Sequence, residues 1–346
     1  MQWDEEYSCA GKTTLLDLLA GRRIKGRISS GSEILYDGHR PTPRYKQQQV
    51  GYVEQQDTLL EMLTPYEMLV YTAELKLPRA TSKEEIKERV QNLIDKLNLN
   101  SCQHTVIGPQ WQQKISGGEA KRTNIGISMI SNPSVLFIDE LTSGLDAYTG
   151  HEAALAVKGL SDSGITICLS LHSPPPRTFQ LFDRLLMIQK GRVLYFGPSG
   201  LDVLNYLEQN FPCLRSMDEN EGVAEYLLDV TTKSGDEEEA NFADTYLKSE
   251  RYKYNCYIIK NRTIPEGDIE KLETISQVSK TTSTASQDLP WCQSIEQAIP
   301  RANPTWWALW VMWRYRSLRS WLRISFIAPR VFEKLIIVFL ITTLWW

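Results

Sequence analysis

The sequence predicts an α/β fold whose parallel sheet carries a phosphate-binding site. The first observation is the run 135–138, four consecutive apolar residues followed at once by Asp139 and Glu140. Such a run is typical of a strand buried on both faces of a parallel sheet, and α/β sheets place their ligands at the carboxyl ends of strands. The second is Gly11-Lys12-Thr13 with apolar helical residues behind it, which favours a phosphate-binding loop.

The composition is that of an ordinary globular protein. The 346 residues carry a formal net charge of -4 and are 42% hydrophobic, so nothing in the balance favours a nucleic-acid partner. The six cysteines are scattered, without the spacing of a metal site or a disulfide framework, which indicates reduced thiols. The acidic N-terminus lacks the apolar run of a secretory signal.

Residues 10–14 have the sequence of the end of a P-loop and the start of its helix. Lys12 would place its charge on the β- and γ-phosphates, the Thr13 hydroxyl would ligate Mg²⁺, and the amides from Ala10 to Thr14 would cradle the phosphates. The front of the loop departs from the pattern, because Glu6 stands where a glycine is required. We also expect the first strand of the sheet, which should precede the loop, to be missing.

Several strands and helices follow in order. Strands are predicted at 31–38 and 49–53, the second ending in a polar loop that contains Gln55. Helices are predicted at 66–77 and 82–97, where Ser82 and Glu85 form a capping box. The second helix has an apolar face that we assign to core packing, made of Ile86, Val90, Leu93, Ile94 and Leu97.

A glycine turn opens the next helix, predicted over about 119–130. Ser116, Gly117 and Gly118 precede it, and amides at such a helix start can bind an anion. After the strand at 135–138 we predict a helix at 149–160, a buried strand at 166–170, and a hairpin at 184–197 that turns at Lys190-Gly191.

The last third of the chain changes in character. Residues 231–302 are rich in polar and charged side chains, and the acidic run at 236–239 is most simply solvated; we expect an extension followed by a flexible linker. Residues 303–325, with tryptophans and arginines together, predict an amphipathic helix at a membrane interface. Residues 326–346 look like the start of a transmembrane helix, because 335–346 are uncharged and mostly apolar; these twelve residues are fewer than the roughly 20 that a spanning helix needs.

The motifs taken together resemble those of an ABC-type ATPase. Residues 115–119 resemble the signature motif, 135–140 the Walker B strand, and 141–146 the D-loop. Gln55 resembles the glutamine of the Q-loop, and His172 the switch histidine. The resemblance implies a P-loop NTPase fold of the ABC type, with a nucleotide-binding domain over 1–230 and a helical subdomain at about 57–130.

The same resemblance implies ATP and Mg²⁺ as cofactors and assigns the site residues. Glu140 would polarise the attacking water, His172 would contact the γ-phosphate, and Gln55 would position metal and water. The metal ligands would be Thr13, Gln55 and Asp139. The nucleotide contacts would be Ala10, Gly11, Lys12, Thr13, Thr14, Gln55, Ser116, Gly117, Gly118, Asp139 and Asp146, of which Ser116 to Gly118 would act on the ATP of a second subunit.

The nearest resemblance within the ABC proteins is to the G subfamily, the White-like half-transporters. It covers roughly residues 11–251 and resumes near Asn303, and its supporting segments are 118–126, 181–185, 193–198, 224–230 and 242–249. Departures from the family pattern are Cys9, Leu141 and the prolines at 174–176. The subfamily implies an ATP-driven exporter of lipids, sterols or xenobiotics, a homo- or heterodimer with another half-transporter, and a membrane location with this domain on the cytosolic side.

Two other functions remain open from the sequence. The chain could be a catalytically inactive or incomplete fragment of such a transporter, because Glu6 and Cys9 disturb the P-loop. It could also be a soluble ABC ATPase, which would share the nucleotide motifs but would have no need of the Trp- and Arg-rich segment.

Overall fold

The centre of the molecule is a three-stranded parallel sheet. The computed structural model describes residues 11–22, 29, 32–36, 40–108, 114–218, 221–232 and 236–261. Strands β1 (Val50–Val53), β2 (Val135–Ile138) and β3 (Thr166–Leu169) lie in that order. Val53 pairs with Ile138 and Ile138 with Leu169, so the three carboxyl ends are level with one another. The predicted α/β fold is thereby confirmed, as are the strands predicted at 49–53, 135–138 and 166–170. The last of them was wrongly predicted to be buried: as the edge strand of the described sheet, its residues are half-buried or exposed.

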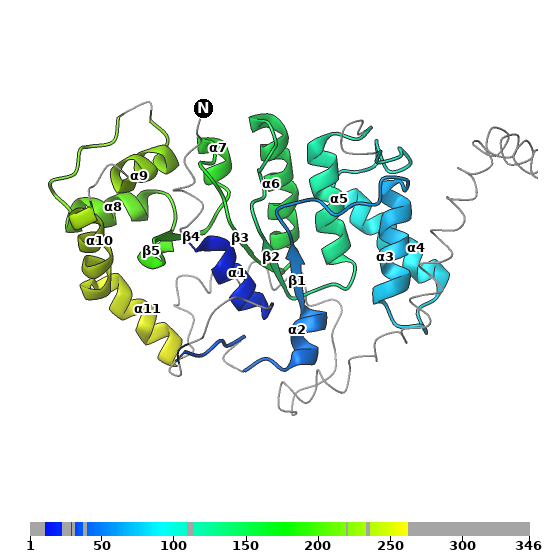
Figure 1. The fold of residues 1–346 in the computed structure, drawn as a ribbon, viewed down its shortest axis with the longest axis horizontal. Helices are drawn as coiled ribbons and strands as arrows, with labels where there is room; N and C mark the ends of the chain where they lie inside the picture. Colours follow the sequence, from blue (N-terminus) through cyan, green and yellow to red (C-terminus); the bar gives the residue numbers. More distant parts are fainter. Residues whose placement is uncertain are drawn as a thin grey trace, which may run out of the picture.

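Helices surround this sheet (Figure 1). In chain order the helices up to the strand β3 are α1 (Lys12–Ala20), α2 (Pro43–Gln49), α3 (Pro65–Lys76), α4 (Lys83–Lys96), α5 (Gly117–Met129) and α6 (Ala147–Asp162). Helix α5 contacts β1 on one side and α3, α4 and α6 on the others, so it joins the sheet to the helical layer at one end of the molecule. One hydrophobic core runs through both parts.

Helix caps explain where several of these helices begin. Thr64 and Ser116 each form a reciprocal capping box, with Glu67 and Glu119 respectively. Ser82 accepts a hydrogen bond from the Glu85 amide at 3.1 Å, which is one half of the box predicted there. The predicted apolar face of α4 is confirmed, because all five of its residues are buried.

A second group of elements lies at the other end of the molecule (Figure 1). It contains the antiparallel strands β4 (Arg184–Gln189) and β5 (Arg192–Pro198), and the helices α7 (Pro176–Phe179), α8 (Leu201–Asn210), α9 (Val223–Thr232), α10 (Asp236–Lys248) and α11 (Glu250–Asn261). The hairpin turns at Lys190 and Gly191, with φ values of 46° and 76°, as a primed turn requires. Aromatic side chains dominate its core, including Tyr195, Tyr206 and Phe242.

Two local predictions were wrong. In the described part of the strand predicted at 31–38, residues 32–36, only an isolated bridge at Tyr36 forms. The Tyr36 hydroxyl donates to the Leu19 carbonyl and its ring packs on Tyr45, so the segment is held by α1 and α2. Helix α5 begins at Gly117 instead of Glu119, because Ser116 caps it.

The predicted extension and linker at 231–302 begins with ordered helices. The acidic run starts α10, whose Phe242, Ala243 and Tyr246 are buried against β5. Residues 262–302, the amphipathic segment 303–325 and the segment 326–346 lie outside the described residues, as do Glu6, Cys9 and Ala10. Within the described ranges, no helix combines the length and the apolar character that a membrane crossing requires.

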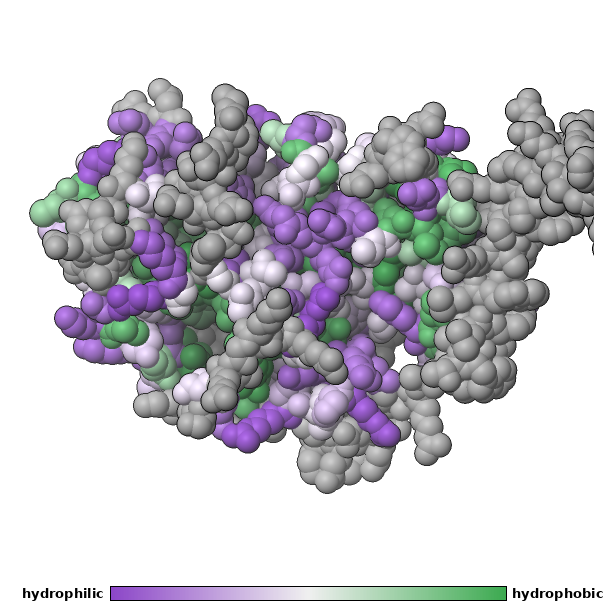
Figure 2. Space-filling model, viewed as in Figure 1, coloured by the Kyte–Doolittle hydropathy of each residue, from purple (hydrophilic) through white to green (hydrophobic). Residues whose placement is uncertain are grey.

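The surface in the same view is mixed. Figure 2 shows hydrophilic residues over the middle of this face and hydrophobic ones near the start of α3. Leu60, in the loop between β1 and α3, is 43% exposed. Single exposed leucines of this kind are normal for soluble domains and carry no functional assignment.

Candidate functional site

The carboxyl end of β2 and the first turn of α1 meet at Asp139 and Thr13. The Thr13 hydroxyl donates a hydrogen bond to Asp139 Oδ1 at 3.2 Å. Asp139 is only 5% exposed, and its amide donates to the Val53 carbonyl at 2.9 Å. Mg²⁺ is bound through one or two carboxylates or hydroxyls together with phosphate oxygens and water. The pair therefore has the donor set of such a site, although its residues lie 126 positions apart in the sequence.

The start of α1 has the geometry of an anion site. Gly11 adopts a φ of 88°, and no side chain caps the helix. The first intrahelical bond runs from the Leu15 amide to the Gly11 carbonyl, so the amides of Lys12, Thr13 and Thr14 have no acceptor within the helix. Such amides, together with the positive end of the helix dipole, favour a bound phosphate.

Lys12 lies between this helix start and the loop that follows β3. Its ammonium donates to the Leu171 carbonyl at 3.4 Å. His172, the next residue, has an exposed side chain. The structure therefore brings the predicted switch histidine to the edge of the sheet where α1 begins.

Glu140 is held in an unusual backbone conformation at the same edge. Its φ is 56°, in the left-handed region that non-glycine residues rarely adopt. The Glu140 amide donates to the Ser170 hydroxyl at 2.8 Å, and that hydroxyl donates to Asp139 Oδ1 at 2.8 Å. Ser170 was not among the residues predicted from the sequence.

Gln55 follows β1, so its loop also reaches this edge. Its side chain is exposed, whereas its carbonyl accepts a hydrogen bond from the Lys121 ammonium at 2.9 Å. Lys121 is 1% exposed and also reaches the Glu54 carbonyl at 3.3 Å and Asp57 Oδ1 at 3.4 Å. The side-chain amide of Asn124 (Nδ2) donates to the same carboxylate at 3.0 Å. Sequence reasoning missed Lys121, because it stands beside Glu119, Arg122 and Asn124 and does not differ from them in the sequence pattern.

The side chain of Glu54, in the same loop as Gln55, is also held in place. Arg22, just after α1, pairs with Glu54 at 2.5 Å and lies 4.3 Å from the centre of the Tyr52 ring. Hydrogen bonding to the Glu54 carboxylate, offset in part by burial, raises the pKa of Arg22. The loop that carries Gln55 is therefore anchored by α1 through a side chain and by α5 through its backbone.

The turn 116–118 forms a second cluster with the D-loop segment. Ser116 accepts from the Glu119 amide at 3.2 Å and donates to Glu119 Oε2 at 2.9 Å. A Cβ on Gly117 would lie 3.0 Å from Leu145 Cδ2, and one on Gly118 would lie 3.2 Å from Thr149 Cβ. The two glycines therefore allow the turn to pack closely on the start of α6.

Asp146 caps that helix. Its Oδ1 accepts hydrogen bonds from the Tyr148 and Thr149 amides, both at 3.0 Å, and its Oδ2 accepts one from the Thr149 hydroxyl at 2.7 Å. These bonds lower the pKa of Asp146, those from Thr149 most of all. In the part of the chain that the structure describes, no hydrogen bond or ion pair links the turn 116–118 to Thr13 or Asp139, so the predicted site residues form two clusters.

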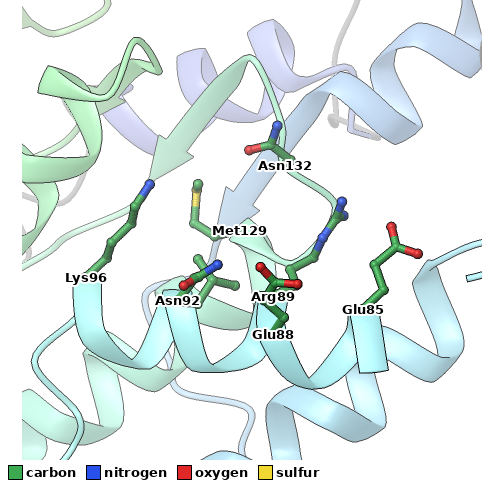
Figure 3. A pocket seen from close by; sticks show the side chains of 8 residues that line it. Glu85, Glu88, Arg89, Asn92, Lys96, Met129 and Asn132 are labelled. Carbon is green, nitrogen blue, oxygen red and sulfur yellow. The ribbon is translucent and has the colours of Figure 1, made fainter. Parts of the chain in front are cut away.

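Two clefts lie away from both clusters. The smaller, of about 320 Å³, is lined by α4 together with Met129 and Asn132, and Figure 3 shows Glu88 and Arg89 from α4 beside it. The larger, of about 510 Å³, is lined partly by Gln49, Ser134 and Ile165, which directly precede the three strands. The larger cleft therefore lies toward the amino ends of the strands, and the smaller one adjoins it at Met129 and Asn132. Ligands of α/β sheets, in contrast, bind at the carboxyl ends.

Comparison with known proteins agrees with the family resemblance predicted from the sequence. Residues 7–143 match the family model described as ABC transporter. The chain is 39% identical over 226 residues to the ABC transporter G family member STR of Medicago truncatula, which covers 65% of this chain and 27% of that protein. It is 30% identical over 346 residues to the ABC transporter G family member 14 of Arabidopsis thaliana, which covers 98% of this chain and 50% of that protein.

A relative from an animal matches as well. The ATP-binding cassette sub-family G member 8 of Rattus norvegicus is 35% identical over 222 residues, which is 64% of this chain and 31% of that protein. The chain spans about half or less of the length of these curated relatives.

Proposed function

Since this chain carries an ABC transporter domain and is homologous to the transporters of the G family, we propose that the cluster around Thr13 and Asp139 binds and hydrolyses Mg-ATP. The hydrogen bond between Thr13 Oγ1 and Asp139 Oδ1 carries the proposal, because it joins the helix start that suits phosphate to the carboxylate that suits the metal. In the described residues no group of three or more His, Cys, Asp and Glu side chains could hold a metal by itself, and a nucleotide-bound Mg²⁺ does not require one.

The residues of α1 would bind the phosphates. Lys12 would move from the Leu171 carbonyl to the phosphate oxygens, which are stronger acceptors for an ammonium. The amides from Gly11 to Thr14 would hold the same phosphates, and Thr13 with Asp139 would supply oxygens to Mg²⁺. When bound, Mg²⁺ would neutralise charge on the phosphates. Phosphoryl transfer needs mainly such positioning and charge stabilisation.

Three residues at the strand ends would act on the attacking water and the transferred phosphate. Glu140 would orient the water and accept its proton, and Gln55 would contact both the water and the metal. His172 would contact the γ-phosphate. Their positions support these roles. Gln55 follows β1, Glu140 follows β2 and His172 follows β3, and the carboxyl ends of the three strands are level.

The second cluster would act on the ATP of another subunit. Ser116, Gly117, Gly118 and Asp146 would contact that nucleotide, so turnover would require a dimer with an identical or a different half-transporter. The lack of any hydrogen bond or ion pair from the turn 116–118 to the Thr13–Asp139 cluster, within the described ranges, supports this separation of roles. The complete transporter would export a lipid, a sterol or a xenobiotic, with this domain on the cytosolic side of a membrane.

The test is Mg-ATP binding by the full chain and by Lys12→Ala. We expect binding in roughly the micromolar to millimolar range, which corresponds to about 4 to 8 kcal/mol, and its loss in the variant. Lys96→Ala, a lysine on α4 beside the distant cleft, is the matched control and should bind like the wild type. A folded wild-type chain that does not bind Mg-ATP would contradict the proposal.

The same preparations decide between the alternatives. Binding without turnover in a dimeric sample would favour a catalytically inactive transporter subunit. Recovery of the full chain in the soluble fraction, with turnover intact, would favour a soluble ABC ATPase.

A further inference from the structure

Ser170 lies directly after β3 and is buried, with 8% of its surface exposed. Its hydroxyl donates to Asp139 Oδ1 at 2.8 Å and accepts from the Glu140 amide at 2.8 Å. We propose that Ser170 is a positioning residue for ATP hydrolysis, which holds the metal-binding carboxylate and the backbone of Glu140 in place; this inference rests on the proposed function of the Thr13–Asp139 cluster.

The direction of the two hydrogen bonds is fixed. A serine hydroxyl has one proton to donate, and the Glu140 amide can only donate. The proton of Ser170 must therefore point to Asp139, where the hydrogen bond is charge-assisted. Because Ser170 and Thr13 both donate to Oδ1, they set the orientation of the carboxylate. The other oxygen, Oδ2, has no hydrogen bond among the described residues and is the one available to a metal.

The second bond stabilises a strained backbone. The left-handed conformation costs a non-glycine residue free energy, and Glu140 has a φ of 56°. Ser170 offsets that cost by accepting the hydrogen bond of the Glu140 amide. The direction in which the Glu140 side chain leaves the strand end therefore depends on Ser170.

The backbone of Ser170 adds two more links to the same strand end. Its amide donates to the Ile138 carbonyl at 2.9 Å, and its carbonyl accepts from the Leu141 amide at 3.4 Å. Two residues further along is His172, and the carbonyl between them, that of Leu171, accepts from Lys12. Ser170 thus stands where the phosphate-binding helix, the metal-binding strand and the His172 loop meet.

If Ser170 only stabilises the fold, its removal should lower stability without changing how nucleotide binding responds to Mg²⁺. The chain provides a matched control for this distinction. Ser249 is also 8% exposed, and its hydroxyl also donates and accepts, to the Tyr246 carbonyl at 2.6 Å and from the Tyr252 amide at 3.2 Å. It belongs to the aromatic core around α10 and α11. Ser249→Ala therefore removes a comparable buried hydroxyl without touching Asp139 or Glu140.

The experiment measures binding of trinitrophenyl-ATP to the full chain, in EDTA and across a Mg²⁺ titration. For Ser170→Ala we expect the Mg²⁺ concentration that gives half of the maximal change in nucleotide binding to rise about tenfold. One lost charge-assisted hydrogen bond can weaken Mg²⁺ binding by this factor. Binding in EDTA should stay unchanged. Ser170→Thr, which keeps the hydroxyl, should restore much of the Mg²⁺ response, and Ser249→Ala should leave it unchanged even if the variant melts earlier.

Each other result has a defined meaning. If Ser170→Ala does not fold, Ser170→Cys replaces it, because a thiol keeps the size of the side chain but bonds weakly. A wild-type Mg²⁺ response in a folded Ser170→Ala or Ser170→Cys chain would overturn this inference alone. A wild-type chain that binds no nucleotide with or without Mg²⁺ would overturn the proposed function and this inference with it.

Discussion

The ammonium of Lys121 lies 2.9 Å from the carbonyl oxygen of Gln55, with the lysine side chain only 2% exposed. A buried charge is costly unless it is fully hydrogen-bonded, and Lys121 meets this condition with two carbonyls and the Asp57 carboxylate. Lys121 stands on α5, the helix that begins with the turn 116–118. Helix α5 therefore carries both the turn proposed to act on a partner's ATP and Lys121, which holds the loop of Gln55.

We expect Lys121→Met to destabilise the fold by about 1–3 kcal/mol, because the Glu54 and Gln55 carbonyls lose the ammonium that donates to them and Asp57 loses its ion pair. The control is Lys76→Met: Lys76 is exposed, and it also donates to a backbone carbonyl, that of Ile127 at 3.0 Å, away from the Gln55 loop. Urea unfolding measures the stability of both variants, and Mg-ATP binding measures the site. Equal loss of nucleotide affinity in both variants would show that Lys121 has no special connection to Gln55.

The motifs that the sequence revealed are those whose residues are close together along the chain. Lys12 and Thr13 stand at a helix start, and Asp139 stands at the end of a buried strand, so local pattern was sufficient to find them. Lys121 and Ser170 could not be found in this way, because their partners lie 66 and 31 positions away and only the folded sheet brings them together.

The helices α10 and α11 were missed for a related reason. The run at 236–239 is acidic and looks solvated, but Phe242, Ala243 and Tyr246 recur at helical spacing just behind it. The composition of the whole segment hid that short apolar stripe. Tertiary packing on β5 decides the structure there, since an isolated helix of this length is marginal in water.

The close packing of the turn 116–118 on α6 predicts opposite effects for two glycine substitutions. Gly118→Ala should destabilise the fold by about 1–3 kcal/mol, because its Cβ would crowd Thr149 at 3.2 Å. Gly159→Ala, on the same α6 but with no atom within 4 Å of the new Cβ, should stabilise it by about 0.5–1 kcal/mol. Urea unfolding of both variants measures the contrast. A Gly118→Ala chain as stable as the wild type would show that α6 can move away without cost.

We expect the ionised carboxylate of Glu119 to stabilise the fold, and this contribution to be lost in acid. Burial raises the pKa of this carboxyl, but hydrogen bonds from the amide and hydroxyl of Ser116 and from the Cys102 thiol outweigh burial, so its pKa lies below the ordinary 4.5. Because the folded pKa is lower than the unfolded one, the ionised group favours folding above about pH 4.5. That contribution disappears as the pH falls through the folded pKa.

The check is the unfolding free energy of the wild type and of Glu119→Gln between about pH 3 and 6. Glutamine preserves the shape of the cap, so the wild type should be the more stable chain at pH 6 and the difference should shrink toward pH 3. Glu88→Gln on α4 controls for the general loss of a negative charge. A difference that stays constant over the whole range would show that ionised Glu119 contributes nothing to folding.

Glu140→Gln should separate ATP binding from hydrolysis. The substitution leaves the backbone amide, and therefore its hydrogen bond to Ser170, in place. It also preserves side-chain size while removing the group that would accept a proton from water, so turnover should fall at least about 100-fold. Mg-ATP affinity should stay near that of the wild type, because Lys12, Thr13 and Asp139 are untouched. The measurements are phosphate release and equilibrium binding on the same sample, with Glu88→Gln as the control.

Turnover is compared at matched protein concentrations, because a dimer is proposed to be the active form. Undiminished phosphate release by Glu140→Gln would mean that another group activates the water.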